Sequence, residues 1–176
     1  MEVARLVQDD QTTIDEIVGC HIGAFTCIFG YDDETRTPYP NIFLIETQEN
    51  SNWHRIFLEA GICFWDLYEE FPDHDVEFEP DLFPMCEFVK GSELEGAEIL
   101  SAVVNPYEQG CKVEITFSGG VTFETSIRTC TNEDEAVATL AGEPLTLKQA
   151  ESGRNGILTR SPHTTTHTGR VSGGSN

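Results

Sequence analysis

The stretch from Cys111 to Arg128 alternates apolar and polar residues on both sides of a glycine pair. A period of two places the apolar side chains on one face of a β-strand. β-Branched and aromatic residues dominate both runs, which is the composition that strands prefer. The pattern predicts a β-hairpin and favours a fold built largely from antiparallel strands.

The length of the hairpin loop follows because opposed residues must share a face of the sheet. A two-residue Gly119-Gly120 loop would place Phe117 opposite Thr122 and mix apolar with polar residues. A loop that is one residue longer pairs Phe117 with Val121 and keeps each face uniform. We therefore predict a three-residue loop with Gly120 at positive φ in a G1 bulge.

The same register sets Glu114 opposite Glu124 on the polar face. Like charges that face each other directly across two strands are unfavourable. Screening by solvent is the simpler explanation of how the fold tolerates them, and a bound cation or a partner is the alternative.

The charge of the chain is extreme and unevenly distributed. The 176 residues carry a formal net charge of −21; residues 1–148 hold 30 acidic and 7 basic residues, whereas residues 149–176 hold 1 and 3. Such a field repels nucleic acids and anionic membranes and attracts basic partners or cations. The chain has three lysines against seven arginines, and an acidic, lysine-poor surface also suits a high-salt cytoplasm.

No targeting or membrane segment is recognisable in the sequence. The N-terminus lacks a basic start followed by an apolar run, and no apolar run approaches the ~20 residues of a membrane helix. We therefore expect a cytoplasmic protein whose six cysteines are reduced and behave as small buried hydrophobes.

Beyond the hairpin, apolar patterning and turn signals predict further strands and two short helices. The expected strands cover residues 21–31, 41–47, 53–59 and 61–68, with a last short strand within 144–147. The expected helices cover residues 13–19 and 132–140, each introduced by a capping residue. Three prolines in and around residues 73–81 reduce that segment to an edge strand or an extended loop.

The order of elements repeats along the chain. Gly19 and Ile22 recur as Gly96 and Ile99 at an offset of 77 residues, and each pair precedes a strand, a loop, a strand, a turn and a strand. The two blocks cover residues 17–59 and 94–128. They are consistent with an internal duplication, although β-meanders resemble one another in any case. We expect an α+β, β-rich fold in which two antiparallel three-stranded meanders form one sheet or a partly closed barrel.

The chain is expected to divide into an acidic globular domain, residues 1–148, and a tail, residues 149–176. An apolar content of 39% is sufficient for one core. The side chains expected to be mostly buried are Ile22, Ile28, Leu44, Ile56, Phe57, Val113, Ile115, Phe117, Val121, Phe123 and Ile127. The tail consists mainly of Gly, Ser, Thr, Arg and His. Because such a composition cannot offset the entropy cost of ordering, the tail is predicted to be disordered.

Motifs for catalysis or for metal and cofactor binding do not occur in the sequence. It contains no CxxC, GxSxG or P-loop. The residues from Asp73 onward begin like an EF-hand loop, but Phe78 stands where glycine is needed and Pro84 where the last glutamate belongs. No catalytic residue, metal or cofactor is therefore expected. Basic patches typical of nucleic-acid binding do not occur either.

One stretch, from Asp66 to Asp81, contains eight carboxylates and lies among aromatic residues. Concentrating like charges destabilises a fold, and solubility alone would be served by spreading them over the surface. The clustering therefore favours a cationic ligand such as a basic protein surface, with charge steering association and aromatic residues anchoring the complex. The candidate partner-binding residues are Trp65, Asp66, Tyr68, Glu69, Glu70, Phe71, Asp73, Asp75, Glu77, Glu79 and Asp81.

The function expected from this character is that of a non-enzymatic acidic binding protein with a basic protein partner. Immunity or inhibitor proteins and nucleic-acid mimics share this character, and the expectation rests on that analogy. One alternative is a small hydrolase or metal-assisted enzyme that uses Asp66, Glu69, Glu70 or Asp73 with His74. Another is a housekeeping domain whose acidity only serves solubility.

Overall fold

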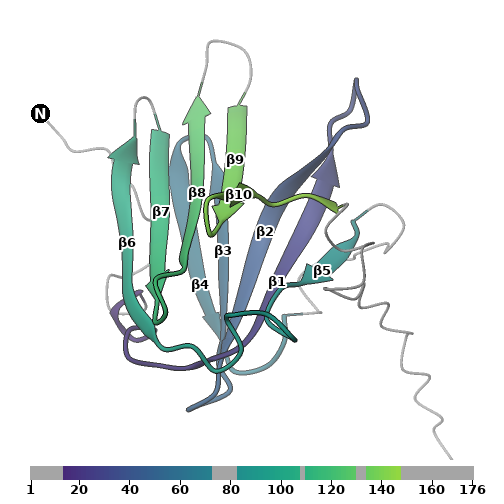
Figure 1. Cartoon of the computed structure of the whole chain (residues 1–176). Helices are drawn as coiled ribbons and strands as arrows, with labels where there is room; N and C mark the ends of the chain where they lie inside the picture. The colour runs from purple at the N-terminus through teal and green to yellow at the C-terminus, as the bar shows by residue number, and fades with distance from the viewer. Residues whose placement is uncertain (1–13, 73–82, 108–109, 130–133, 148–176) are drawn as a thin grey trace, which may run out of the picture.

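The computed structural model describes residues 14–72, 83–107, 110–129 and 134–147, which form two five-stranded antiparallel sheets (Figure 1). The first sheet contains β1 (Ile22–Tyr31), β2 (Pro38–Thr47), β3 (Trp53–Glu59), β4 (Ile62–Tyr68) and β5 (Met85–Glu87) in the order β4-β3-β2-β1-β5. The second contains β6 (Ile99–Tyr107), β7 (Gly110–Phe117), β8 (Thr122–Thr129), β9 (Asp134–Leu140) and β10 (Glu143–Pro144) in the order β10-β9-β8-β7-β6.

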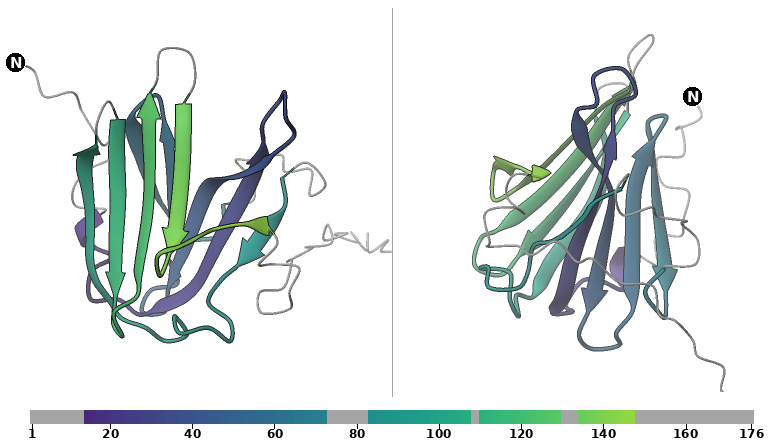
Figure 2. Two further views of the ribbon diagram at one scale, coloured as in Figure 1. Left: turned by 45° about the horizontal axis from the view of Figure 1, so that its top comes forward. Right: turned by 90° about the vertical axis from the view of Figure 1, so that its right-hand side faces the viewer.

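The two sheets pack face to face as two layers (Figure 2). Strand β2 contacts β9, β3 contacts β8 and β4 contacts β7. The expectation of a β-rich fold with two antiparallel meanders is therefore confirmed, whereas their arrangement in one sheet or a partly closed barrel is wrong. Each meander has a fourth strand and a short fifth one, and each sheet buries its apolar face against the other sheet rather than closing on itself.

The predicted hairpin is confirmed in position and register. Ile115 lies opposite Phe123, and Glu114 lies opposite Glu124. The Phe117 N–H donates to the Val121 carbonyl oxygen at 2.8 Å, which closes a three-residue loop. Gly120 has a φ of 81°, as predicted, and its neighbour in the loop also has a positive φ, so both glycines supply a conformation that other residues adopt only with strain.

Two helices expected from the sequence do not form as regular helices in the described residues. The segment 134–140 is strand β9, paired along β8, because the free edge of β8 supplies more backbone hydrogen bonds than an isolated turn of helix could. Residues 14–19 form a helical turn followed by further turns, and Thr13, its expected cap, lies outside the described residues. Ile14 and Ile17 are nevertheless buried, as the apolar face of the expected helix required.

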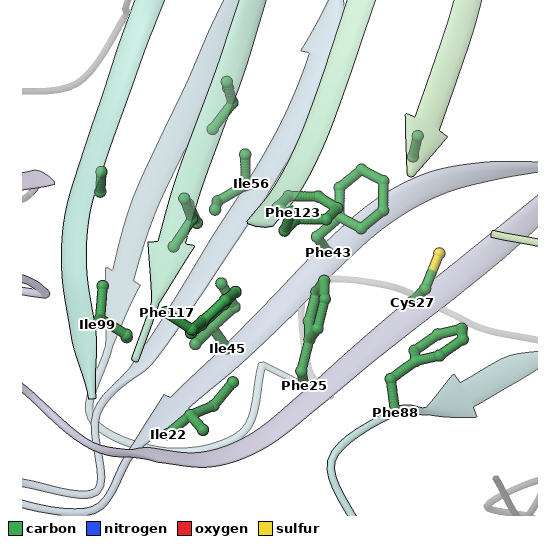
Figure 3. Close-up of a cluster of buried hydrophobic side chains, with 14 of the residues drawn as sticks. Ile22, Phe25, Cys27, Phe43, Ile45, Ile56, Phe88, Ile99, Phe117 and Phe123 are labelled. Atoms are coloured by element: carbon green, nitrogen blue, oxygen red, sulfur yellow. The ribbon is translucent and has the colours of Figure 1, made fainter. Parts of the chain in front are cut away.

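The core lies between the sheets and is rich in aromatic rings (Figure 3). Phe123 from the second sheet packs edge-on against Phe25 and Phe43 from the first, with ring centroids 4.9 and 4.8 Å apart. These three side chains are at most 1% exposed. Of the predicted core, the side chains of Ile22, Ile28, Leu44, Ile56, Val113, Ile115, Phe117, Val121, Phe123 and Ile127 are buried.

The starts of the two sheets repeat the same backbone hydrogen bonds. The Ile22 N–H donates to the Ala97 carbonyl oxygen at 2.9 Å, and the Ile99 N–H donates to the Cys20 carbonyl oxygen at 2.8 Å. The two bonds exchange under the 77-residue offset, since 22 + 77 = 99 and 20 + 77 = 97. The segments therefore pair with each other about a local pseudo-two-fold axis.

The residues at this axis continue the correspondence. His21 and Glu98, which are also 77 residues apart, form a β-bridge. The His21 carbonyl oxygen accepts from the Gln48 N–H at 2.8 Å, and the Glu98 carbonyl oxygen accepts from the Ser118 N–H at 2.8 Å. The register of β1 on β2 and of β6 on β7 shifts at the same place, after Ile22 and after Ile99. The likeness of the two halves thus extends from element order to individual backbone bonds.

Candidate functional site

Trp65, which was expected to anchor a partner, lies in the core. Its side chain is 0% exposed, and its indole Nε1–H donates to Nδ1 of His54 at 3.1 Å. Alternation along β4 points this residue toward the second sheet, whereas its neighbours on either side point outward. Trp65 therefore cannot contact a partner on this surface, and that part of the sequence-based prediction is wrong.

His54 is a buried histidine whose hydrogen bond identifies its protonated nitrogen. It is 1% exposed, and burial lowers its pKa to about 4. The ring is therefore neutral near neutral pH, and because Nδ1 accepts from Trp65 the proton is assigned to Nε2. This residue belongs to the core rather than to a surface site.

Asp66 points outward and is held by a basic side chain of the neighbouring strand. Its Oδ2 accepts from Nη2 of Arg55 at 2.5 Å and from Nε at 3.0 Å. Glu69 and Glu70 follow β4 and are exposed. The hydrolase hypothesis required these three carboxylates to converge, whereas Asp66 forms an ion pair within the sheet.

The other predicted site residues divide between described and undescribed parts of the chain. Tyr68 and Phe71 are half-buried, and the Phe71 ring packs edge-on against Trp53 with centroids 4.9 Å apart. The remaining residues lie outside the described part of the structure: Asp73, His74, Asp75, Glu77, Glu79 and Asp81.

Sequence reasoning missed a surface that surrounds Asp66 on β3 and β4. Arg55 stacks over Phe57 and Tyr68, with its guanidinium carbon 5.5 and 5.1 Å from the ring centroids. The Phe57 ring stacks in turn on Phe64, with centroids 4.6 Å apart and planes 4° from parallel. We call the set Trp53, Arg55, Phe57, Phe64, Asp66 and Tyr68 the aromatic outer face.

The position of Phe57 on this face corrects the predicted core, which included it. Phe57 is half-buried, whereas its neighbour Ile56 is 0% exposed. Alternation contained the signal: once Ile56 faces inward, the residues on either side must face outward. The part of the outer face that lies on β3 could therefore have been recognised from parity.

Along β7 and β8 the outer face of the second sheet is polar, and its side chains show how the fold tolerates the two glutamates that face each other. The Lys112 amino group lies 2.8 Å from the Glu124 carboxylate and 3.4 Å from that of Glu114. The hydrogen bond with Glu124 raises the pKa of Lys112 and lowers the pKa of Glu124. Neither solvent screening nor a bound cation is needed, because the protein supplies its own cation.

The five described cysteines are free thiols. Cys27, Cys63, Cys86 and Cys111 are 0% exposed. Burial raises the pKa of each of these four thiols, to about 11 for Cys86 and Cys111. They pack as small hydrophobic groups and are poorly suited to act as nucleophiles near neutral pH.

The described residues bring together no group of three or more His, Cys, Asp or Glu side chains that could hold a metal ion. Among the same residues, no helix is long and apolar enough to cross a membrane. No protein family, no curated protein and no solved structure matches the chain.

Proposed function

We propose that this chain is a non-enzymatic binding protein whose partner is a basic protein surface. The proposal rests on one observation: basic side chains of the chain are already engaged by its own acidic and aromatic residues. Arg55 pairs with Asp66, Lys112 pairs with two glutamates, and Arg36 lies over the Tyr31 ring. These three described cations are engaged within the protein, and acidic residues outnumber basic ones by 31 to 10 in the chain.

The aromatic outer face is the part of this acidic surface best suited to docking. Half-buried aromatic rings supply apolar contact area at low cost in side-chain entropy, and Arg and aromatic residues dominate the energetics of interfaces. Exposed carboxylates stand at both ends of the two strands, with Glu59 at one end and Glu69 and Glu70 at the other. A basic partner would meet a central apolar contact between two acidic rims.

Charge reversal at the two acidic rims distinguishes docking on a basic partner from an acidity that serves only solubility. The variant Glu59→Lys/Glu69→Lys/Glu70→Lys is compared with Glu16→Lys/Glu34→Lys/Glu143→Lys, which has the same net charge and also changes exposed positions. Both proteins and the wild type are used as bait in native lysate at about 0.1 M and about 0.5 M salt, between which the screening length falls about twofold. Any captured protein is then titrated against each bait.

The expected result is a basic protein that binds the wild type and the control variant but binds the rim variant at least roughly tenfold more weakly, a difference of about 1.4 kcal/mol. Equal weakening by the two variants would indicate non-specific attraction by net charge. Capture of no basic protein at either salt concentration would refute the proposal.

A further inference from the structure

The outer edge of β1 is covered by β5, a strand of only three residues. The Phe88 N–H donates to the Phe25 carbonyl oxygen at 2.8 Å, and the Phe29 N–H donates to the Pro84 carbonyl oxygen at 2.9 Å. The edge strand of the first sheet is therefore protected by a short antiparallel segment that adds backbone hydrogen bonds to it.

The equivalent edge of β6 lacks such a cover. In the part of the chain that the structure describes, β6 pairs with β7 only, apart from a few bonds at its start. Thr26 and Ile28 on β1 are 2% and 1% exposed, whereas Val103 is 40% exposed and Asn105 is also exposed. These pairs correspond under the repeat, since 26 + 77 = 103 and 28 + 77 = 105.

The backbone of β6 directs hydrogen-bonding groups toward this edge. Ala102 and Val104 correspond to the β1 residues that face β5, because alternate residues of a strand bond to opposite neighbours. Their carbonyl groups and the Val104 N–H are the groups that an added strand would meet. Pro106 corresponds to Phe29 and has no N–H to donate, which limits pairing to the segment before it.

The side chains beside this edge form an apolar patch. Leu100 and Val103 are 50% and 40% exposed. Val18 is 42% exposed and lies beside the start of β6, because the Gly19 N–H donates to the Ile99 carbonyl oxygen at 2.8 Å. Three of the six exposed large hydrophobic residues of the described chain therefore gather at one strand edge.

We propose that the free edge of β6, over Leu100–Val104, accepts an extended basic segment of the partner as an added antiparallel strand. Main-chain hydrogen bonds would give affinity, as in other cases of strand addition. An apolar side chain of the segment would pack on the patch. A Lys or Arg two residues along the segment, on the same face, would reach Glu114, which lies opposite Val103 on β7 and is 38% exposed.

The negative charge of the chain favours a basic segment, rather than a second copy of the chain, as the strand that is added to β6. Pairing two copies edge to edge would bring together two chains of formal charge −21, with the unfavourable self-repulsion that this entails. A basic segment is attracted by the same field. The inference rests on the proposed function and assigns to it a specific strand edge.

The test uses the full chain and a synthetic extended peptide in which successive positions of one strand face carry Val or Ile and Lys or Arg in turn. Three comparisons distinguish strand pairing from general electrostatic attraction. The first uses an acidic peptide with Glu in place of the basic residues, and the second uses a basic peptide whose backbone nitrogens on the pairing edge are methylated. The third uses two protein variants. Val103→Lys blocks the edge, and Val137→Lys, at a site 56% exposed on β9, adds the same charge elsewhere. Titration gives affinity, and amide hydrogen exchange reports on Val104.

The proposal predicts that the basic peptide slows exchange of the Val104 amide and that Val103→Lys weakens binding roughly tenfold more than Val137→Lys. It also predicts that the N-methylated and acidic peptides bind much more weakly. Equal effects of the two variants, or full binding of either control peptide, would overturn the assignment of the edge while leaving the proposed function in place.

Two results with the free protein would also overturn it. A dimer in sedimentation with a protected Val104 amide would show that a second copy occupies the edge. Protection that disappears on truncation after Lys148 would show that the chain's own basic tail does. If no basic protein and no basic peptide binds, the proposed function itself fails.

Discussion

Replacing His54 with phenylalanine should remove an acid-sensitive element of stability. The repeat suggests the substitution, because His54 lies opposite Ile45 on the neighbouring strand and Phe123 occupies the corresponding position opposite Ile115. Within the core His54 adjoins Trp65, and its pKa falls from 6.5 to about 4 because burial disfavours the charged ring. The folded protein consequently binds fewer protons than the unfolded chain between these two values.

The sign and size of the effect follow from this difference in protonation. The contribution of His54 is fully present above the unfolded pKa of 6.5 and is lost progressively as the pH falls toward about 4. At about pH 5 the loss amounts to about 2 kcal/mol, and it approaches about 3 kcal/mol below the folded pKa. The phenylalanine variant has no such term, although it leaves the Trp65 indole N–H without its acceptor, at a cost of about 1–3 kcal/mol.

Urea unfolding of both proteins at about pH 7.5 and about pH 5, at one ionic strength, measures the difference. The wild type should lose about 2 kcal/mol more than the variant between these pH values, since the carboxylates are common to both. A His54→Phe/Trp65→Phe double variant controls for the unpaired indole. If the wild type and the variant lose the same stability on acidification, His54 is not held neutral by burial and the reasoning fails.

Three further predictions concern the core, the surface and the tail. Ile115→Ala, at a side chain that is 0% exposed, should cost about 2–5 kcal/mol in denaturant unfolding; a loss below about 1 kcal/mol would contradict its place in the core. Lys112→Gln should cost up to about 1 kcal/mol at low salt and less at high salt, because it leaves Glu114 facing Glu124; a cost independent of salt would argue against electrostatics. Truncation after Lys148 should leave the melting temperature nearly unchanged in calorimetry, and a large drop would show that the tail stabilises the domain.

The hairpin could be predicted from the sequence because its register is a matter of parity. Only one loop length keeps Phe117 and Val121 on the same face, and the register found in the structure is the one that this argument requires. The expected strand at 53–59 is confirmed to the residue, for it too is bounded by turn signals. Local alternation with clear ends is therefore sufficient where one face of a strand is apolar and the other polar.

Other elements depend on contacts that the local sequence does not contain. Asn132 and the acidic residues after it have the sequence pattern of a helix N-terminus. Residues 134–140 nevertheless form strand β9, because β8 provides an edge with which they can pair. Strand β5 has three residues and exists because β1 binds it. In β4 the residues are apolar on both faces, so alternation could not tell whether Trp65 or Phe64 faces the core. The second sheet, which covers Trp65, decides the question.

The aromatic outer face is informative because the repeat provides a reference for it. Corresponding positions on the second sheet, placed by the same register, carry Thr122 for Trp53, Glu124 for Arg55 and Ser126 for Phe57. Those residues make an ordinary solvated sheet surface. Because the same backbone arrangement is stable with polar side chains, the fold does not require aromatic rings there. The chain itself uses part of this face, since the Phe71 ring packs on Trp53, and the proposed docking of a partner would account for the remaining rings.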